Sequence, residues 1–69
     1  MKIVQVTLLN IDGAETLTTW VDSRPDLKPG SLIALKDFKP EINWRVVNMY
    51  PGEHDADGFD FHRKWTNNI

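Results

Sequence analysis

Polar and apolar residues alternate along much of this chain with the period of two that is typical of β-strands. In the first segment, Val4, Val6 and Leu8 fall on one face, while Gln5 and Thr7 fall on the other. Elsewhere, β-branched and aromatic residues gather in short runs that suit strands better than helices. The pattern predicts strands at residues 2–9, 15–22, 32–35, 42–50 and 59–65.

Turn signals separate these segments. Asp12-Gly13 predicts a hairpin in which glycine takes the positive φ of a tight turn. Pro29-Gly30 predicts a second turn, because proline presets φ at one position and glycine supplies the left-handed one. Pro51-Gly52 ends the fourth strand, and residues 66–69 are predicted to be a frayed tail.

Two of the later strands show which side chains should face the core. In the fourth, Ile42, Trp44, Val46 and Tyr50 are expected on one face, opposite Asn43 and Arg45. In the fifth, alternation is expected to place one set inward and the other outward. The inward set is Phe59, Phe61 and Trp65, and the outward set is Asp60, His62 and Lys64.

No segment combines a helical period with capping residues, so the fold class predicted for residues 1–69 is all-β. Five short strands joined by turns indicate one small antiparallel barrel or sandwich, since closing a sheet removes its exposed edges. The length allows one domain with a small core.

The middle of the chain resembles the central hairpin of SH3-like small barrels. The residues that carry this resemblance are Leu27 to Lys36, with the Pro-Gly turn, and Trp44-Arg45-Val46-Val47. The resemblance implies an SH3-like barrel but no particular function, because such barrels host peptide binding and RNA binding alike. The aromatic motif of peptide-binding SH3 domains and the basic residues of RNA-binding versions are both missing.

Composition limits the available chemistry. Hydrophobic residues make up 41% of the chain and charged residues 26%, as in an ordinary globular domain. There is no cysteine, so disulfides and thiolate zinc sites are excluded. No apolar run approaches the roughly 20 residues of a membrane helix, and the first residues do not form a signal peptide, so we expect a cytoplasmic protein without membrane contact.

Catalytic and metal sites are not predicted, and no cofactor is implied. The serines Ser23 and Ser31 lie in turns without a base beside them. Asp55-Ala56-Asp57-Gly58 resembles the start of a calcium loop, but its fifth and twelfth positions hold Phe59 and Thr66. His54 and His62 lack the spacing of a known metal motif. We therefore expect a protein that is not an enzyme.

A basic stretch near the end offers a nucleic-acid interface as an alternative. Arg63 and Lys64 would neutralise phosphates, Trp65 would stack on a base, and Arg45 would add a further cation. A net charge of −2 and the acidic run just before these residues oppose this interpretation. Core packing of Trp65 is the competing explanation.

A protein interface is the favoured hypothesis. If Leu17 and Val21 face inward, Trp20 faces outward and becomes an anchor for a partner; a different register would place it in the core. The loop residues Arg24, Asp26 and Phe38 are expected to surround it. Three acidic residues, Glu53, Asp55 and Asp57, would attract a basic partner.

The chain also resembles short proteins of tailed bacteriophages of actinobacteria. The residues that carry this resemblance are Thr18 to Gly30 and Phe61 to Trp65. It implies a viral accessory protein that binds a host or viral protein in the host cytoplasm. A minor structural component of the virion remains an alternative, and self-association into a homo-oligomer would bury an exposed tryptophan.

Overall fold

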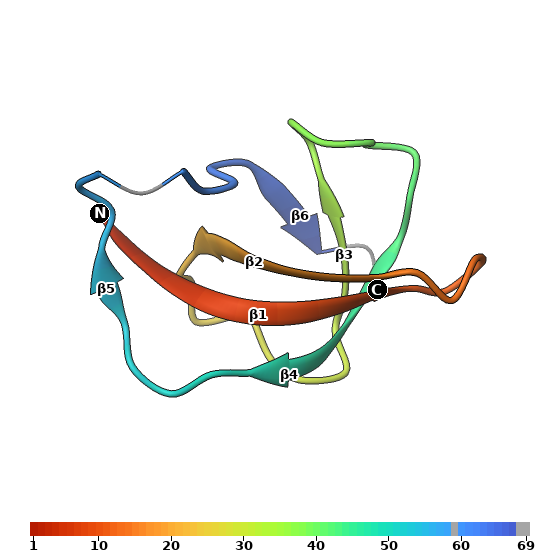
Figure 1. The fold of residues 1–69 in the computed structure, drawn as a ribbon, viewed down its shortest axis with the longest axis horizontal. Helices are drawn as coiled ribbons and strands as arrows, with labels where there is room; N and C mark the ends of the chain where they lie inside the picture. The colour runs from red at the N-terminus through yellow and green to blue at the C-terminus, as the bar shows by residue number, and fades with distance from the viewer. Residues whose placement is uncertain (59, 68–69) are drawn as a thin grey trace.

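Six antiparallel strands form one sheet in the computed structural model of the chain, which describes residues 1–58 and 60–67 (Figure 1). No helix occurs in this part of the chain, so the all-β prediction is confirmed there. The strands are β1 (Lys2–Asn10), β2 (Thr16–Asp22), β3 (Leu32–Leu35), β4 (Trp44–Met49), β5 (His54–Asp55) and β6 (Trp65–Asn67).

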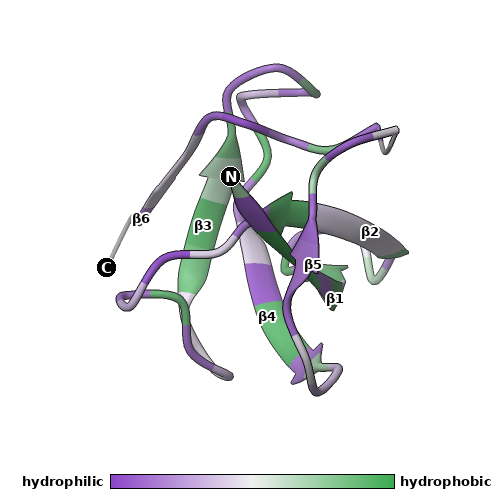
Figure 2. Cartoon of the chain, turned by 90° about the vertical axis from the view of Figure 1, so that its left-hand side faces the viewer, coloured by the Kyte–Doolittle hydropathy of each residue, from purple (hydrophilic) through white to green (hydrophobic). Residues whose placement is uncertain are grey.

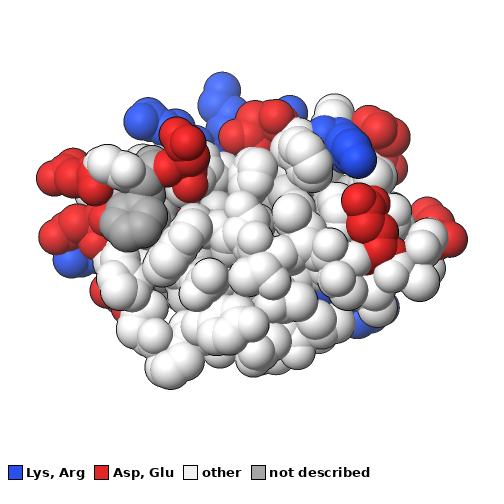
Figure 3. Space-filling view, in the orientation of Figure 1, with Lys and Arg blue, Asp and Glu red and all other residues white. Residues whose placement is uncertain are grey.

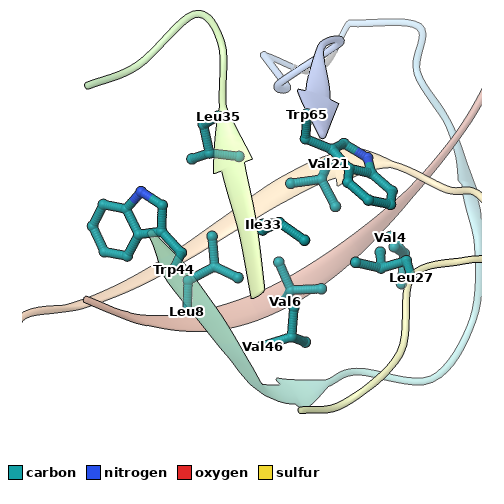
Figure 4. Packing of buried hydrophobic residues seen from close by; sticks show 10 residues of the cluster. All are labelled: Val4, Val6, Leu8, Val21, Leu27, Ile33, Leu35, Trp44, Val46 and Trp65. Carbon is teal, nitrogen blue, oxygen red and sulfur yellow. The ribbon is translucent and has the colours of Figure 1, made fainter. Parts of the chain in front are cut away.

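The sheet follows the order β2-β1-β4-β3-β6, and β5 pairs with the start of β1. This order does not close on itself, because the link described between the β2 side and the chain before β6 is an isolated parallel bridge between Val21 and His62. A closed five-stranded barrel is therefore not confirmed. The sheet is strongly curved (Figures 1 and 2), and its strands surround the buried side chains (Figure 4).

The first hairpin forms where the alternation predicts it, but its turn differs from the prediction. Antiparallel pairing runs from Ile3 opposite Asp22 to Leu9 opposite Thr16. The left-handed residue in the turn is Ala14, with φ of 57°, and not Gly13. Ala14 N–H donates to the carbonyl of Asn10 at 3.0 Å, which fixes that residue in the turn.

The Pro-Gly turn before β3 has the geometry that its sequence predicts. Ser31 N–H donates to the carbonyl of Lys28 at 3.1 Å, and Gly30 between them has φ of 91°. This is the hydrogen bond and the left-handed third residue of a type II turn. Gly30 N–H also donates to the carbonyl of Val46 at 2.7 Å, so the turn is fixed to β4.

A β-bulge in β4 reverses the side-chain direction predicted for its last residues. Leu8 of β1 pairs with Val46, whereas Thr7 pairs with Asn48, which leaves Val47 as an extra, exposed residue. Trp44 and Val46 are buried as expected. Beyond the bulge the alternation shifts by one residue. Tyr50 therefore does not join the core face as predicted: it is 38% exposed.

The C-terminal third departs furthest from the predicted strand at residues 59–65. Phe59 lies outside the described residues, and residues 60–64 contain only the bridge at His62. His62, predicted to point to water, packs instead against Phe38, with ring centroids 5.8 Å apart, and its Nδ1 lies 2.9 Å from Asp37 Oδ1.

Residues 66 and 67, predicted to belong to a frayed tail, lie in a strand. Thr66 and Asn67 belong to β6 and pair with Ala34 and Ile33 of β3. Residues 68–69 lie outside the described part of the chain. The two-residue strand β5 lies between the strands predicted at residues 42–50 and 59–65, and its His54 pairs with Ile3.

Side chains from every strand but β5 fill a single core (Figure 4). Figure 2 shows that β3 is hydrophobic along most of its length. The buried cluster consists of Val4, Val6, Leu8, Val21, Leu27, Ile33, Leu35, Trp44, Val46 and Trp65. Its two tryptophans differ in how their indole N–H groups are satisfied. Trp65 donates to the carbonyl of Asp22 at 2.8 Å, whereas the buried Nε1 of Trp44 has no acceptor among the described residues.

Replacing Gly30 by Ala is expected to lower the free energy of unfolding by about 1 kcal/mol, because a side chain disfavours the left-handed region. A Cβ at this position meets no atom within 4 Å, so the backbone conformation alone determines the cost. The midpoint of urea denaturation measures the change. The matched variant Ala14→Gly relieves the same kind of strain, and an equal loss of stability in that variant would contradict the explanation.

Trp44→Phe is expected to destabilise the fold less than Trp65→Phe, by a difference of about 1–2 kcal/mol. Both residues are at most 1% exposed, so both substitutions remove a similar buried volume. Trp65→Phe also removes a hydrogen bond, whereas Trp44→Phe removes an N–H group that is already unsatisfied. Urea denaturation of the two variants tests this order, and the opposite order would show that Trp44 Nε1 has an acceptor in solution.

Candidate functional site

The outward side of β1, β2 and β4 forms a broad surface that we call the uncharged face. Alternate residues of each strand point to this side, because the residues between them fill the core. Figure 3 shows that Lys, Arg, Asp and Glu are absent from the centre and the lower edge of this view and gather along its left, upper and right margins. The strand register places on this face Gln5, Thr7, Leu9, Thr16, Thr18, Trp20, Asn48 and Tyr50. It also places Arg45 there, opposite Leu9 near the first hairpin, with its guanidinium bonded to the carbonyl of Gly30.

Three hydroxyl groups connect the strands of this face. Thr7 Oγ1 lies 3.0 Å from Thr18 Oγ1 on β2 and 3.1 Å from the Tyr50 hydroxyl after β4. Each hydroxyl thus has a hydrogen-bond partner within the protein. These hydrogen bonds remain when a bound partner displaces water from the face. The free-energy cost of removing water is therefore lower than for polar groups that have no partner within the protein.

Trp20 lies on the uncharged face and outside the buried cluster. It pairs with Gln5 across the β1–β2 ladder and is partly buried. Its ring meets the ring of His54 edge to face, with centroids 5.1 Å apart and an interplanar angle of 87°. Of the two possibilities that the sequence left open, the structure therefore favours the outward one, with the indole held against β5.

The acidic residues of the predicted interface lie at the β5 end of the molecule. Lys2 Nζ is 2.8 Å from Asp55 Oδ1, and both side chains are largely exposed. The hydrogen bond from Lys2, and then its positive charge, lower the pKa of the Asp55 carboxyl, and the same contact raises the pKa of Lys2. Glu53 accepts a hydrogen bond from Ser23 Oγ, whereas Asp57 is exposed.

Of the three loop residues predicted to surround Trp20, two contact buried tryptophans and the third lies beside one of these two. The Arg24 guanidinium carbon lies 3.3 Å from the centre of the Trp65 ring, and Nη2 donates to the Trp65 carbonyl at 2.7 Å. Asp26 Oδ1 is 3.6 Å from Arg24 Nε. Phe38 stacks on Trp44, with centroids 6.5 Å apart. These contacts give Arg24 and Phe38 a role in covering the two buried tryptophans.

The residues of the nucleic-acid alternative do not form a stacking surface. Trp65 is 1% exposed, so stacking on a base would require it to leave the core. Arg45 donates to the carbonyl of Gly30 at 2.7 Å, and the Arg63 guanidinium lies 5.3 Å from the centre of the Phe61 ring. Lys64 is exposed.

A pocket of about 390 Å³ lies between the start of the chain and the segment before β6. It is lined by Met1, Ala56, Asp57, Gly58, Phe61 and Arg63. The lining holds one cation and one carboxylate but no serine, threonine or histidine. In the described part of the chain, no group of three or more His, Asp or Glu residues is placed to hold a metal ion.

Thr7, Thr18 and Tyr50, which form the hydroxyl chain of this face, are not among the interface residues predicted from the sequence. The alternation of β1 and β2 already puts Thr7 and Thr18 on the outer side. Tyr50 joins them only because of the bulge at Val47, for which the sequence carries no clear signal.

Comparison of the chain with known proteins finds no matching family model, no matching curated protein and no matching solved structure. Among the described residues, no helix has the length and hydropathy that a membrane crossing requires. The uncharged face is therefore interpreted from its own side chains and their contacts.

The carboxyl of Asp55 is expected to titrate with a midpoint below its ordinary value of 3.8. Its contribution to folding is present above that value and is lost as the pH falls through the lowered folded-state pKa. The contribution of Lys2 is present below 10.5 and is lost as the pH rises through its raised pKa. The β5–β1 contact should thus be insensitive to pH between these limits.

Carboxyl chemical shifts recorded by NMR against pH measure the Asp55 midpoint. Lys2→Met is expected to move that midpoint upward, because it removes both the hydrogen bond and the positive charge. Lys28→Met, which removes a lysine from the turn before β3, is the matched control. A midpoint that does not move in Lys2→Met would show that the pair does not form in solution.

Proposed function

We propose that this protein is a non-enzymatic binding module that docks on another protein through the uncharged face. The supporting observation is the distribution of charge in Figure 3: a centre without Lys, Arg, Asp or Glu, with these residues along its left, upper and right margins. Protein interfaces have this anatomy, with charged residues depleted at the core and a polar rim around it.

The side chains of the face suit this role. Trp20 and Tyr50 offer aromatic surface of the kind that dominates interface energetics. The hydroxyl chain through Thr7 is already hydrogen-bonded, so a partner can displace water from it at low cost. The molecule measures 32 by 21 Å along its two longer axes. A face of these dimensions is comparable with the roughly 800 Å² that a standard interface takes from each partner.

The proposed partner is a host or viral protein, and the proposed setting is the host cytoplasm of a bacteriophage infection. The resemblance of Thr18 to Gly30 and of Phe61 to Trp65 to phage proteins supports the setting. A place in the virion is compatible with the same face, since a joining protein also needs a surface free of charge. An SH3-like barrel that is incompletely closed is the proposed fold type, supported by the Pro-Gly turn and by the strand that follows it.

Placing a charge on the uncharged face is expected to abolish binding. Thr18 is exposed, so Thr18→Glu is compatible with folding, yet a partner would have to bury an unpaired carboxylate. Stoichiometric capture of a protein by the tagged wild-type chain, quantified by mass spectrometry, should fall at least about tenfold in this variant, which corresponds to about 1.4 kcal/mol.

Lys28→Gln is the matched control, because it changes the net charge by the same amount in the turn before β3. This variant should capture the same protein as the wild type. Equal capture by Thr18→Glu and the wild type, with both folded by circular dichroism, would exclude the uncharged face as the binding surface.

A further inference from the structure

The free backbone edge of β2 can be located from the hydrogen bonds of its last residues. His62 N–H donates to the carbonyl of Trp20 at 3.0 Å, and Asp22 N–H donates to the carbonyl of His62 at 3.1 Å. Backbone groups of successive strand residues point to opposite sides, so Trp20 and Asp22 face away from β1. By the same alternation, the N–H and C=O groups of Thr16 and Thr18 also face away from β1.

This part of the edge is unpaired within the described part of the chain. β2 stands at the end of the sheet order, and its described ladder partner is β1. Of the described backbone groups outside that ladder, none is hydrogen-bonded to Thr16 or Thr18. Natural sheets protect free edges with lysine, proline or bulges, and residues 16–21 contain none of these.

We infer that an extended segment of a partner protein adds to β2 as a further strand beside Thr16 and Thr18. This inference rests on the proposed function and specifies how the partner binds. Strand addition supplies main-chain hydrogen bonds for affinity, and alternate side chains of the added strand contact the neighbouring face. The bridge at His62 shows that the same edge accepts a chain segment at Trp20 and Asp22.

The charges that flank the edge indicate the chemistry of the partner. Glu15 precedes β2, Asp22 ends it, and the residues between them are uncharged. Lys39 Nζ lies 4.0 Å from the Glu15 carboxylate, too far for a hydrogen bond, so Glu15 can pair with a second cation. The segment that fits is therefore extended and uncharged, with Lys or Arg at its ends.

A second copy of the chain fits the edge less well. Antiparallel pairing of two β2 edges would bring the acidic ends of both copies near one another. Each copy also carries a net charge of −2, so the copies repel one another. The partner segment is thus assigned to a different protein, and a homodimer becomes an outcome that the experiment must distinguish.

The test uses peptide probes and amide hydrogen exchange followed by NMR. The first probe is a capped peptide of about seven residues, Lys-Thr-Val-Thr-Val-Thr-Lys, a length typical of one strand. The second replaces both lysines by glutamates, and the third carries N-methyl groups on alternate residues. The lysine peptide is expected to slow exchange at Thr16 and Thr18 by about tenfold or more at a peptide concentration of about 1 mM.

The glutamate peptide should bind several-fold more weakly at low salt, because it opposes Glu15 and Asp22. The N-methylated peptide is made in two versions, with the methyl groups on the odd-numbered or on the even-numbered residues. The version whose methyl groups replace the N–H groups that face β2 should lose binding, since it cannot donate to the edge. Thr18→Pro should lose binding of the lysine peptide while keeping the β1 ladder, because the N–H that it removes faces outward. The N-methylated probe keeps the test decisive if Thr18→Pro does not fold.

Three results would overturn the inference. Shifts confined to Thr7 and Tyr50, with unchanged exchange at Thr16 and Thr18, would leave face docking intact and exclude strand addition. Protection that grows with protein concentration alone, together with a dimer in analytical ultracentrifugation, would assign the edge to a second copy. Absence of binding by the lysine peptide at this concentration would exclude the proposed segment. The capture experiment with Thr18→Glu tests separately whether the uncharged face binds a partner.

Discussion

The alternation of β1 is the constraint on which the rest of the structure depends. Its even-numbered residues bond to β2 through the backbone, and its odd-numbered residues bond toward β4 and β5, as with Tyr50 N–H and the carbonyl of Gln5. The same period sends Val4, Val6 and Leu8 into the core. One strand thereby determines the core, the uncharged face and the direction of the backbone groups in β2.

The parts of the fold that could be predicted are those in which the local preference of the residues favours the same conformation as packing in the core. The first two strands and the Pro-Gly turn are of this kind, because a residue such as Gly30 satisfies its own backbone requirement. The bulge at Val47 could not be predicted, since inserting one residue costs little locally and reverses the faces only beyond it. Ala14 likewise takes the left-handed position because its N–H is bonded to the carbonyl of Asn10 within the hairpin turn, and not by its own preference.

The C-terminal third was predicted poorly because alternation there does not reflect pairing. Phe61 and Trp65 keep the period of a strand, yet the described residues before β6 form no strand: they make the His62 bridge and a hydrogen bond from Lys36 N–H to the carbonyl of Lys64. Contacts with other elements decide its path: His62 packs on Phe38, and Arg24 covers Trp65. For the candidate site, the alternation predicts the outward position of Trp20. The contacts of Arg24 with Trp65 and of Phe38 with Trp44 could not be predicted, because cation–π and stacking contacts with buried tryptophans leave no periodic signal.

The open sheet and the proposed binding mode are two aspects of one feature. A closed sheet would use every backbone group of β2, whereas the single bridge at His62 uses only those of Trp20 and Asp22. In so short a chain, completing the closure would require further ordered residues, each costing about 1–2 kcal/mol of conformational entropy. A partner that brings its own strand supplies those hydrogen bonds without lengthening the chain. The unpaired backbone groups of Thr16 and Thr18 therefore mark both the edge of the sheet and the proposed site at which the strand of a partner binds.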